Sequence, residues 1–367
     1  MSLPINDYLE YMLENGGYDL LLCAGMPPAM KRGSNKVSAM PFPAVESEDI
    51  EDFLASELRP NEVETLDQEL SVDFAFESAV NGGTVARRFR CNAYHQCFGY
   101  SVVFRAIPVD PPTCEELYLP TLVKNLSLLR NGLILVTGPT GVGKSSTLAA
   151  MCRYMNENRK IHIVTIEDPI EYVHHNINAM VVQRQVGMHV ESFQRALRSA
   201  LREDPDVIIV GELRDPETIQ LAMIAAETGH LVMSTLHTNS ASQTISRILN
   251  SFPASQQGHM RVMLADALRA VISQQLVMRA DGQGLVPCFE ILLQNDAVAN
   301  TIRENKIHQL NALIETGIKQ GMRMMDSDLL QWVKEGVVTG EDALCKAINQ
   351  EEFCAQLNDW RKNGVVV

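Results

Sequence analysis

The sequence predicts an α/β protein of two domains, a small N-terminal α/β domain and a larger domain built on a parallel sheet. Three observations support this prediction. The chain has 367 residues, which is more than one hydrophobic core usually holds. Prolines cluster at residues 108–112, and proline removes a backbone donor and disfavours helix. Beyond this cluster, short and wholly apolar runs alternate with helical segments, which is typical of parallel strands covered on both faces.

The composition excludes several classes of protein. Apolar residues make up 46% and charged residues 21% of the chain, as in ordinary soluble domains. The formal charge of -14 disfavours direct contact with nucleic acid, whose phosphates attract basic surfaces. The eight cysteines form no Cys-x-x-Cys pair, so we expect reduced thiols rather than a zinc site or a disulfide framework.

No segment of the sequence predicts insertion into a membrane. The N-terminus lacks the pattern of a signal peptide, and no apolar run approaches the roughly 20 residues that a membrane helix needs. We therefore expect a cytoplasmic protein without a transmembrane segment, whose contact with a membrane would go through a partner.

The N-terminal domain is expected to span residues 1–107. Its first helix should end at Gly16 and Gly17, and its last two strands should form a hairpin around Gly99. The expected helices are Ile5–Leu13 and Glu46–Leu58, and the expected strands are Tyr18–Cys23, Arg88–Tyr94 and Ser101–Ile107.

A linker at residues 108–117 should lead to a core at residues 118–295 and a C-terminal helical subdomain with a tail at residues 296–367. The buried strands of the core are expected at Leu133–Val136, Ile161–Ile166, Val207–Val210 and Leu231–Leu236. Helical periodicity replaces these runs at Val298–Ile314, Ser327–Val333 and Glu341–Ile348.

The first buried run leads directly into a glycine-rich loop and then into a helix-forming segment. The loop is Gly138-Pro139-Thr140-Gly141-Val142-Gly143-Lys144-Ser145, followed by Ser146. Strand, glycine loop and helix in this order are the context that a P-loop requires. The glycines allow backbone amides to face phosphate oxygens, and the helix N-terminus adds a positive dipole. Lys144 would reach the β- and γ-phosphates, and the Ser145 hydroxyl would bind Mg²⁺.

These features predict a site for ATP and Mg²⁺. A GTPase switch would need an Asn-Lys-x-Asp motif, and the nearest segment, residues 305–308, lacks the acid.

Acidic residues follow two other buried runs. Glu167, Asp168 and Glu171 come after Ile161–Ile166, and Glu212 comes after Val207–Val210. Ligands of open α/β sheets bind at the carboxyl ends of the strands. An acid of the first group could therefore orient water or accept its proton, and Glu212 would hold Mg²⁺ directly or through water.

Two histidines flank the fourth run, His230 at its start and His237 at its end. Such a histidine is commonly a capping or core group. Because both are expected at the edge of the sheet next to the other motifs, we expect one of them to sense the γ-phosphate.

The motifs together resemble the type II/type IV secretion ATPases. Residues 165–174 resemble the acidic box of that family, residues 225–238 resemble its histidine box, and residues 200–206 leading to Glu212 are also similar. The resemblance extends from Tyr18 to Ala343. Within the family, the chain is similar to the pilus retraction ATPases, the PilT/PilU-like branch. Its N-terminal region is short, a four-cysteine module is missing, and residues 321–326 resemble a segment of that branch.

The resemblance implies a PAS-like N-terminal domain and a RecA-like ATPase domain with a C-terminal helical subdomain. It further implies a homo-hexamer that hydrolyses ATP with Mg²⁺ to power type IV pilus retraction and twitching motility. Such a ring would be peripherally associated with the inner membrane through a pilus platform protein, and a paralogous retraction ATPase is a further candidate partner.

The resemblance also assigns roles by position. Glu171 is the expected general base, with Glu167 as the alternative, and Glu212 is the acid on the Mg²⁺ side. Arg90 and Arg105 match arginines that reach the nucleotide from the N-terminal domain, and arginine suits bidentate contact with phosphate.

One segment departs from the retraction branch. In residues 297–304, Ala299 and Thr301 stand where the family often has an arginine and a leucine. An accessory retraction paralogue therefore stays open. Two alternatives that do not depend on this segment are a conjugation or secretion ATPase of the same fold and an assembly subunit that binds ATP without hydrolysing it.

Overall fold

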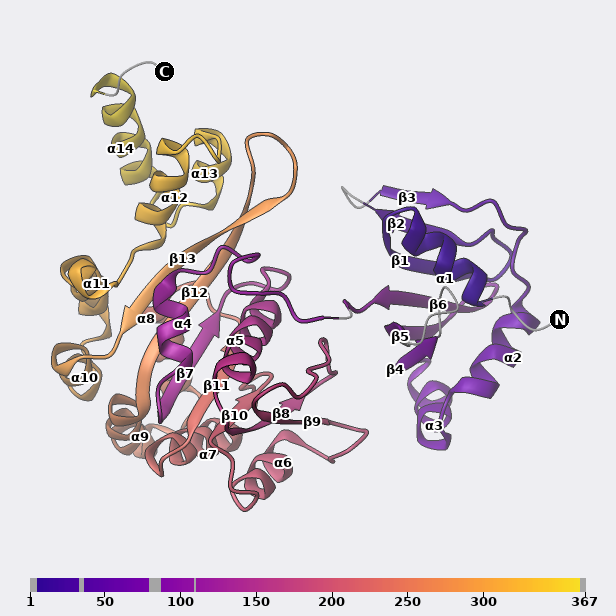
Figure 1. The fold of residues 1–367 in the computed structure, drawn as a ribbon, viewed down its shortest axis with the longest axis horizontal. Helices are drawn as coiled ribbons and strands as arrows, with labels where there is room; N and C mark the ends of the chain where they lie inside the picture. Colours follow the sequence, from indigo (N-terminus) through magenta and orange to yellow (C-terminus); the bar gives the residue numbers. More distant parts are fainter. Residues whose placement is uncertain (1–4, 33–35, 79–86, 109, 364–367) are drawn as a thin grey trace. The chain divides into compact units, whose positions relative to one another are not determined.

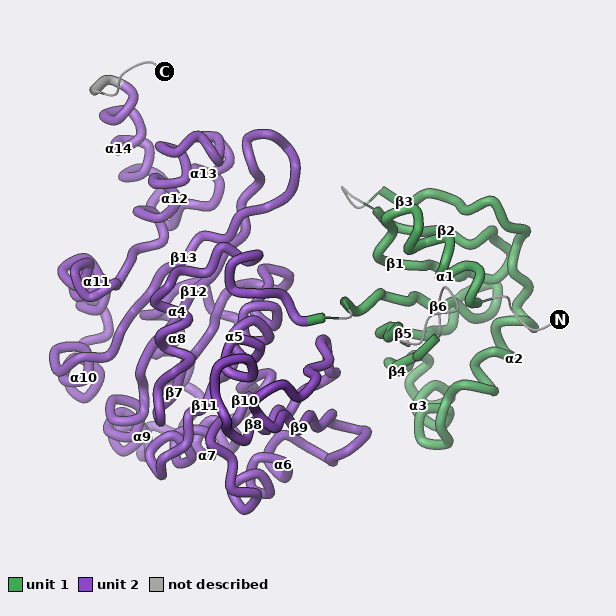
Figure 2. The backbone as a smooth tube through the Cα atoms, in the orientation of Figure 1, with its two compact units in different colours: residues 1–110 green, residues 111–367 purple. Residues whose placement is uncertain are grey.

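The computed structural model describes residues 5–32, 36–78, 87–108 and 110–363. The chain forms two compact units, residues 1–110 and 111–367 (Figure 2). Both units mix helices and strands, so the predicted α/β class is confirmed. Val109 of the predicted linker and residues 364–367 of the predicted tail lie outside the described residues.

The first unit is built on a six-stranded antiparallel sheet with the order β3-β2-β1-β6-β5-β4 (Figure 1). The elements, in chain order, are α1 (Ile5–Glu14), β1 (Gly17–Cys23), β2 (Ala29–Arg32), β3 (Lys36–Ala39), α2 (Ser47–Glu57), α3 (Pro60–Glu69), β4 (Ser71–Ser78), β5 (Arg87–Gln96) and β6 (Gly99–Ala106).

Alternating side chains give the first sheet a buried and an exposed face. Phe76 of β4 packs edge-on against Phe53 of α2, with ring centroids 5.5 Å apart, and Phe89 and Phe104 are fully buried beside them. Strands β5 and β6 form the predicted hairpin, which is confirmed. Strands β2, β3 and β4 and helix α3 were not predicted. Strands β2 and β3 have only four residues each, and α3 buries a single leucine. Strand β4 alternates buried and more exposed residues, a pattern that could have indicated it.

The second unit is built on a seven-stranded sheet with the order β13-β12-β7-β11-β10-β8-β9. Its strands run parallel except β13, which is antiparallel to β12. The strands are β7 (Gly132–Thr137), β8 (His162–Glu167), β9 (Met180–Gln185), β10 (Val207–Val210), β11 (Leu231–Leu236), β12 (Leu268–Met278) and β13 (Leu285–Leu293). The four predicted buried strands are confirmed as β7, β8, β10 and β11.

Helices cover both faces of this sheet, because the central strands are apolar on both sides. Leu133 and Leu135 of β7 pack into one core with helices α6 to α9. Ile134 and Val136 pack into the opposite core, which includes Met151 of α5. The helices of this part of the chain are α4 (Thr121–Ser127), α5 (Lys144–Asn158), α6 (Phe193–Ala200), α7 (Pro216–Glu227), α8 (Ala241–Asn250) and α9 (Ala254–Ala267).

Three strands of the second sheet escaped prediction. Strand β9 lies at the sheet edge and is partly exposed, so it lacks an apolar run. Strand β12 contains Ser273 and Gln274, which are polar residues buried in its middle. Its partner β13 has Pro287 near its start and contains the buried Glu290.

The C-terminal part of the second unit is helical, as predicted, although its last helix was not among those predicted. Its helices are α10 (Asp296–Arg303), α11 (Leu310–Thr316), α12 (Met325–Lys334), α13 (Gly340–Lys346) and α14 (Gln350–Asn363), with short 3-10 turns at Ile307–Gln309 and Ile318–Gln320.

The expected continuous helical stretch at Val298–Ile314 is wrong, because the chain breaks after Arg303, where Asn305 takes the left-handed value φ 60. Within the part of the chain that the structure describes, no helix has the length and apolar character to cross a membrane.

Candidate active site

The P-loop joins β7 to α5, and Lys144 is the first residue of that helix. Gly138, Gly141 and Gly143 have φ values of 146, 83 and 85, which side chains rarely tolerate. Space is also limiting at Gly138, where an added Cβ would lie 2.3 Å from the carbonyl oxygen of Gln274. The glycine spacing therefore follows from the backbone path of the loop.

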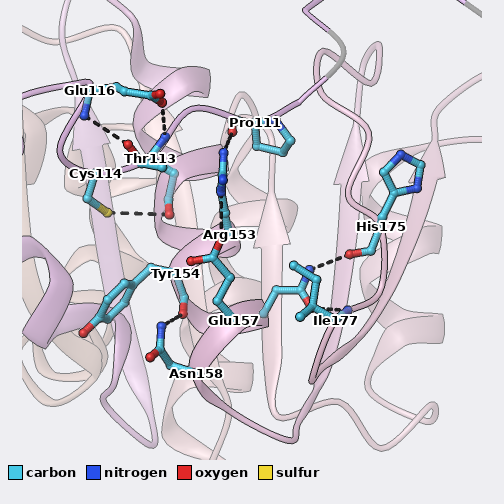
Figure 3. Close-up of polar contacts among 12 residues, drawn as sticks. Pro111, Thr113, Cys114, Glu116, Arg153, Tyr154, Glu157, Asn158, His175 and Ile177 are labelled. Atoms are coloured by element: carbon cyan, nitrogen blue, oxygen red, sulfur yellow. Dashed lines mark hydrogen bonds and ion pairs between the residues drawn. The ribbon is translucent and has the colours of Figure 1, made fainter. Parts of the chain in front are cut away.

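Side chains in the C-terminal half of helix α5 bond to two neighbouring segments of the second unit. Figure 3 shows the Arg153 guanidinium donating to the carbonyl of Pro111, at 2.5 Å. One turn further along the helix, the Asn156 amide donates to the carbonyl of His175 at 2.7 Å. The helix is thus tied to the start of the second unit and to the loop before β9.

Lys144 is buried and bonds to the backbone of the P-loop. Its Nζ donates to the carbonyl oxygens of Gly138 and Pro139, both at 2.8 Å. Burial lowers the pKa of Lys144, and the nearby carboxylates of Glu212 and Glu171 act in the opposite direction. The structure therefore brings the predicted lysine and two of the predicted acids into one electrostatic neighbourhood.

His237 links the P-loop to the end of β10. Its Nδ1 lies 3.3 Å from Lys144 Nζ and 3.4 Å from Thr140 Oγ1, and its Nε2 lies 3.2 Å from Glu212 Oε1. The other oxygen of Glu212 accepts a bond from Arg214 Nε at 2.8 Å. These distances fit a neutral imidazole that donates from Nε2 to Glu212 and accepts from Lys144 at Nδ1.

The acidic loop, residues 167–174, follows β8, and its first residue is held by three neighbours. Glu167 Oε1 accepts bonds from Thr165 Oγ1 at 2.6 Å and from Gln183 Nε2 at 3.1 Å, and the backbone of Glu171 also bonds to this carboxylate. Burial raises the pKa of Glu167 despite these bonds, which lower it.

The rest of the acidic loop is bonded to β9 and to α5. Gln183 Nε2 donates to the carbonyl of Tyr172, and its Oε1 accepts from the amide of His174, both at 2.8 Å. The Tyr172 hydroxyl lies 2.8 Å from Ser146 Oγ. Glu171 is thereby fixed between an anchored glutamate and an anchored tyrosine.

The structure does not bring His230 to this site. The carbonyl of His230 accepts from the amide of Gly132, the first residue of β7, whereas the P-loop follows the last residue of that strand. Six strand residues span about 20 Å, so His230 lies at the opposite edge of the sheet. There its Nδ1 lies 3.0 Å from the carbonyl of Ala225, which fits a capping role.

The two predicted arginines belong to the first unit, where they occupy opposite positions on β5 and β6. Arg105 contacts the carboxylate of Asp19 through two nitrogens, at 2.8 and 3.0 Å, and Asp19 is 1% exposed. Arg90 lies 3.7 Å from a carboxylate oxygen of Asp73. Their contact with nucleotide stays a prediction.

Sequence reasoning missed three residues that shape the site: Tyr172, Gln183 and Gln274. Gln274 carried little signal, because it stands among three consecutive polar residues, Ser273, Gln274 and Gln275. Gln183 carried none, because its importance depends on β9 pairing beside β8.

A cavity of about 450 Å³ opens beside the P-loop. This volume is within the range of small-molecule sites. It is lined by residues 139–142, by residues 275–278 and Leu285 of the β12–β13 hairpin, and by Asp342, Cys345 and Lys346 of α13. The P-loop is therefore open toward the C-terminal helices on this side.

Comparison with known proteins places the chain among secretion ATPases. The model of the type II/IV secretion system protein family matches residues 82–346. A twitching motility protein of Neisseria gonorrhoeae is 48% identical over 85% of this chain and 82% of its own length. The type IV pilus retraction ATPase PilT of Pseudomonas aeruginosa is 44% identical over 96% of this chain and 100% of its own.

A solved structure gives the same result for the fold. The crystal structure of the pilus retraction motor PilT with bound ADP is 41% identical, with a TM-score of 0.87 over 96% of this chain and 99% of that one. The family model covers well over half of the sequence, and the relatives are similar along nearly their whole length. The chain therefore belongs to the type II/IV secretion system protein family.

Proposed function

We propose that this protein is an ATPase motor that hydrolyses ATP to power the retraction of type IV pili. One observation carries the proposal: Lys144, His237 and Glu212 form a continuous polar chain at the carboxyl edge of the sheet. They do so in a chain that is similar to pilus retraction ATPases over almost its whole length.

The P-loop would bind the phosphates of ATP. Backbone amides at the start of α5 supply fixed donors without cost of reorganisation. Lys144 now donates to the carbonyls of Gly138 and Pro139, and phosphate oxygens would replace these acceptors. The lysine would then stabilise the charge that develops on the transferring phosphoryl group.

Glu171 is the general base in this proposal. The carboxylate of Glu167 is engaged by Thr165, Gln183 and the backbone of Glu171, which suits an anchor better than a proton acceptor. Glu171 lies close enough to Lys144 to influence its charge, and a carboxylate there can orient water and accept its proton.

His237 is the γ-phosphate sensor in this proposal. It contacts Lys144 and Thr140 on the P-loop through one ring nitrogen and Glu212 through the other. Movement of Lys144 toward a phosphate would break one of these contacts. The presence or absence of the γ-phosphate would thus change the contacts of His237, which lies in the loop that leads into α8.

Ser145 and Glu212 are the residues that would hold Mg²⁺. Ser145 is an exposed residue in the first turn of α5, and oxygen atoms such as its hydroxyl oxygen are the ligands that Mg²⁺ prefers. Among the described residues, no group of three or more histidines, cysteines or acids gathers as a metal cage, so phosphate oxygens and water would complete the coordination. The ion would neutralise phosphate charge during transfer.

The assembled motor is a homo-hexamer in this proposal, with Arg90 and Arg105 reaching the nucleotide from the N-terminal domain. It would act at the cytoplasmic face of the inner membrane, on a pilus platform protein. The overall similarity to retraction ATPases supports this assignment.

The test is pilus retraction in a strain that lacks this protein. Labelled pili should retract when the strain is complemented with the wild-type chain and should stay extended with Lys144→Ala. Retraction with both variants would overturn the proposal.

An accessory role is the second candidate, because α10 departs from the retraction branch. Ala299 and Thr301 replace an arginine and a leucine, and both are buried, at 2% and 8% exposure. Buried positions cannot take a larger side chain without repacking. A strain that lacks every other retraction ATPase separates the two roles: a main motor restores retraction there, and an accessory protein does not.

A further inference from the structure

Strand β12 contacts the P-loop through the side chain of Gln274, which is 4% exposed. Its Nε2 donates to the carbonyl oxygen of Val142 at 2.6 Å. Its Oε1 accepts from the hydroxyl of Thr147, in the first turn of α5, at 2.8 Å. One amide group therefore ties the loop to the helix that follows it.

The bond to Val142 also sets the direction of the next amide. The carbonyl of Val142 and the N–H of Gly143 belong to one trans peptide, so they point in opposite directions. Gln274 draws the carbonyl toward β12. The Gly143 N–H must then point away from β12, toward the side where P-loop amides meet phosphate.

This peptide would turn over easily if nothing held it. Gly143 has φ 85 and no side chain to resist rotation. Gln274 lies close to the P-loop at two glycines. An added Cβ at Gly138 would lie 2.3 Å from the backbone carbonyl oxygen of Gln274, and one at Gly143 would lie 3.3 Å from its side-chain Nε2. Val142 is buried, so without Gln274 its carbonyl would lose a partner where water has little access.

We propose that Gln274 is a positioning residue of the phosphate site: it holds the peptide between Val142 and Gly143 so that the Gly143 N–H faces the bound nucleotide. Thr147 orients the amide of Gln274 for this task. The inference rests on the proposed nucleotide site, but it does not depend on a role in pilus retraction.

The first arm of the test is the preference of the wild-type chain and of Gln274→Leu for ADP over AMP, measured with fluorescent analogues of both. P-loop amides cradle the α- and β-phosphates, so losing one should weaken ADP binding about tenfold and AMP binding much less. Ser273→Ala is the matched control. Ser273 precedes Gln274 in β12, and its hydroxyl makes a buried hydrogen bond of 2.8 Å with the hydroxyl of Thr137. Removing this bond should leave the preference for ADP unchanged.

The second arm uses Thr147→Val, which retains Gln274 but removes the hydroxyl that orients it. We expect the preference for ADP to fall about threefold, and the double variant to be no worse than Gln274→Leu, because the two residues act as one unit.

An equal loss of ADP and AMP affinity in Gln274→Leu, or an unchanged preference in Thr147→Val, would overturn the inference. The latter outcome decides the matter even if Gln274→Leu fails to fold. A wild-type chain that binds no ADP would instead refute the proposed function.

Discussion

The P-loop and the acidic loop lie at the same edge of one sheet, but they obtain their shapes in different ways. The P-loop is shaped mainly by its own glycines at positive φ and by Lys144, which bonds to two of its carbonyls, with one further bond from Gln274 of β12. The acidic loop is shaped by other elements, through Gln183 of β9 and Ser146 of α5.

The difference explains why one loop was easier to predict than the other. A loop whose conformation depends on its own glycines carries its shape in consecutive residues. A loop held by distant side chains does not, because the partners become neighbours only when the sheet forms. The two loops should therefore respond differently to substitution.

The largest expected effect separates binding from hydrolysis. Lys144→Ala should weaken ATP binding about 100-fold, because the lysine supplies charge to the phosphates. Glu171→Gln should change binding less than about threefold, because a base acts on water rather than on bound phosphate. Dissociation constants of a fluorescent ATP analogue give the comparison. Weak binding by Glu171→Gln would place that residue in the phosphate cradle instead.

The next effect distinguishes the two glutamates of the acidic loop. Glu171→Gln should lower the turnover of ATP by about 10² or more. Glu167→Gln should lower it only about tenfold, since an amide can replace some of the hydrogen bonds of an anchor. Steady-state phosphate release measures both. If Glu167→Gln is the more damaged variant, the assignment of the base is reversed.

Loosening the acidic loop from β9 should have a smaller effect. Gln183→Leu removes bonds to Glu167, Tyr172 and His174, and we expect kcat to fall about tenfold with unchanged ADP affinity. Gln185→Leu is the control on the same strand, because Gln185 accepts a longer bond of 3.3 Å from Ile170. Equal losses in the two variants would mean that the strand, rather than Gln183, holds the loop.

Releasing the acidic loop from α5 should have the smallest effect on turnover. Tyr172→Phe removes the 2.8 Å contact with Ser146, and one net hydrogen bond corresponds to a change in kcat of about fivefold. Tyr154→Phe is the control, because Tyr154 lies on α5 with Ser146, and this variant should retain full turnover. A full loss of turnover in Tyr172→Phe would give the tyrosine a direct part in hydrolysis.

The acidic loop should also make stability depend on pH, with little effect on turnover. Burial lowers the pKa of His174 from 6.5 to about 4, so the unfolded chain takes up the proton first as the pH falls. Stability is therefore lost between pH 6.5 and 4, by about 1 kcal/mol or more. Thermal unfolding should show a weaker pH dependence in His174→Asn than in His175→Asn. Equal dependence in both would show that another group titrates.

The sequence predicted the fold class, the four central strands and the P-loop, because these depend on apolar periodicity and local glycine spacing. It also located the acids and His237, since strand ends in a parallel sheet meet at one edge. The same rule separates His237, at the carboxyl end of β11, from His230, at its start, although the prediction had kept both. The polar strand β12, the edge strand β9 and the break at Asn305 depend on tertiary contacts.

The most direct measurement is phosphate release from ATP and Mg²⁺ by the purified wild-type chain, with Lys144→Ala and Glu171→Gln prepared alongside. The proposed site predicts steady release by the wild type and, in both variants, a rate lower by about two orders of magnitude or more. Release at the wild-type rate in both variants would contradict it.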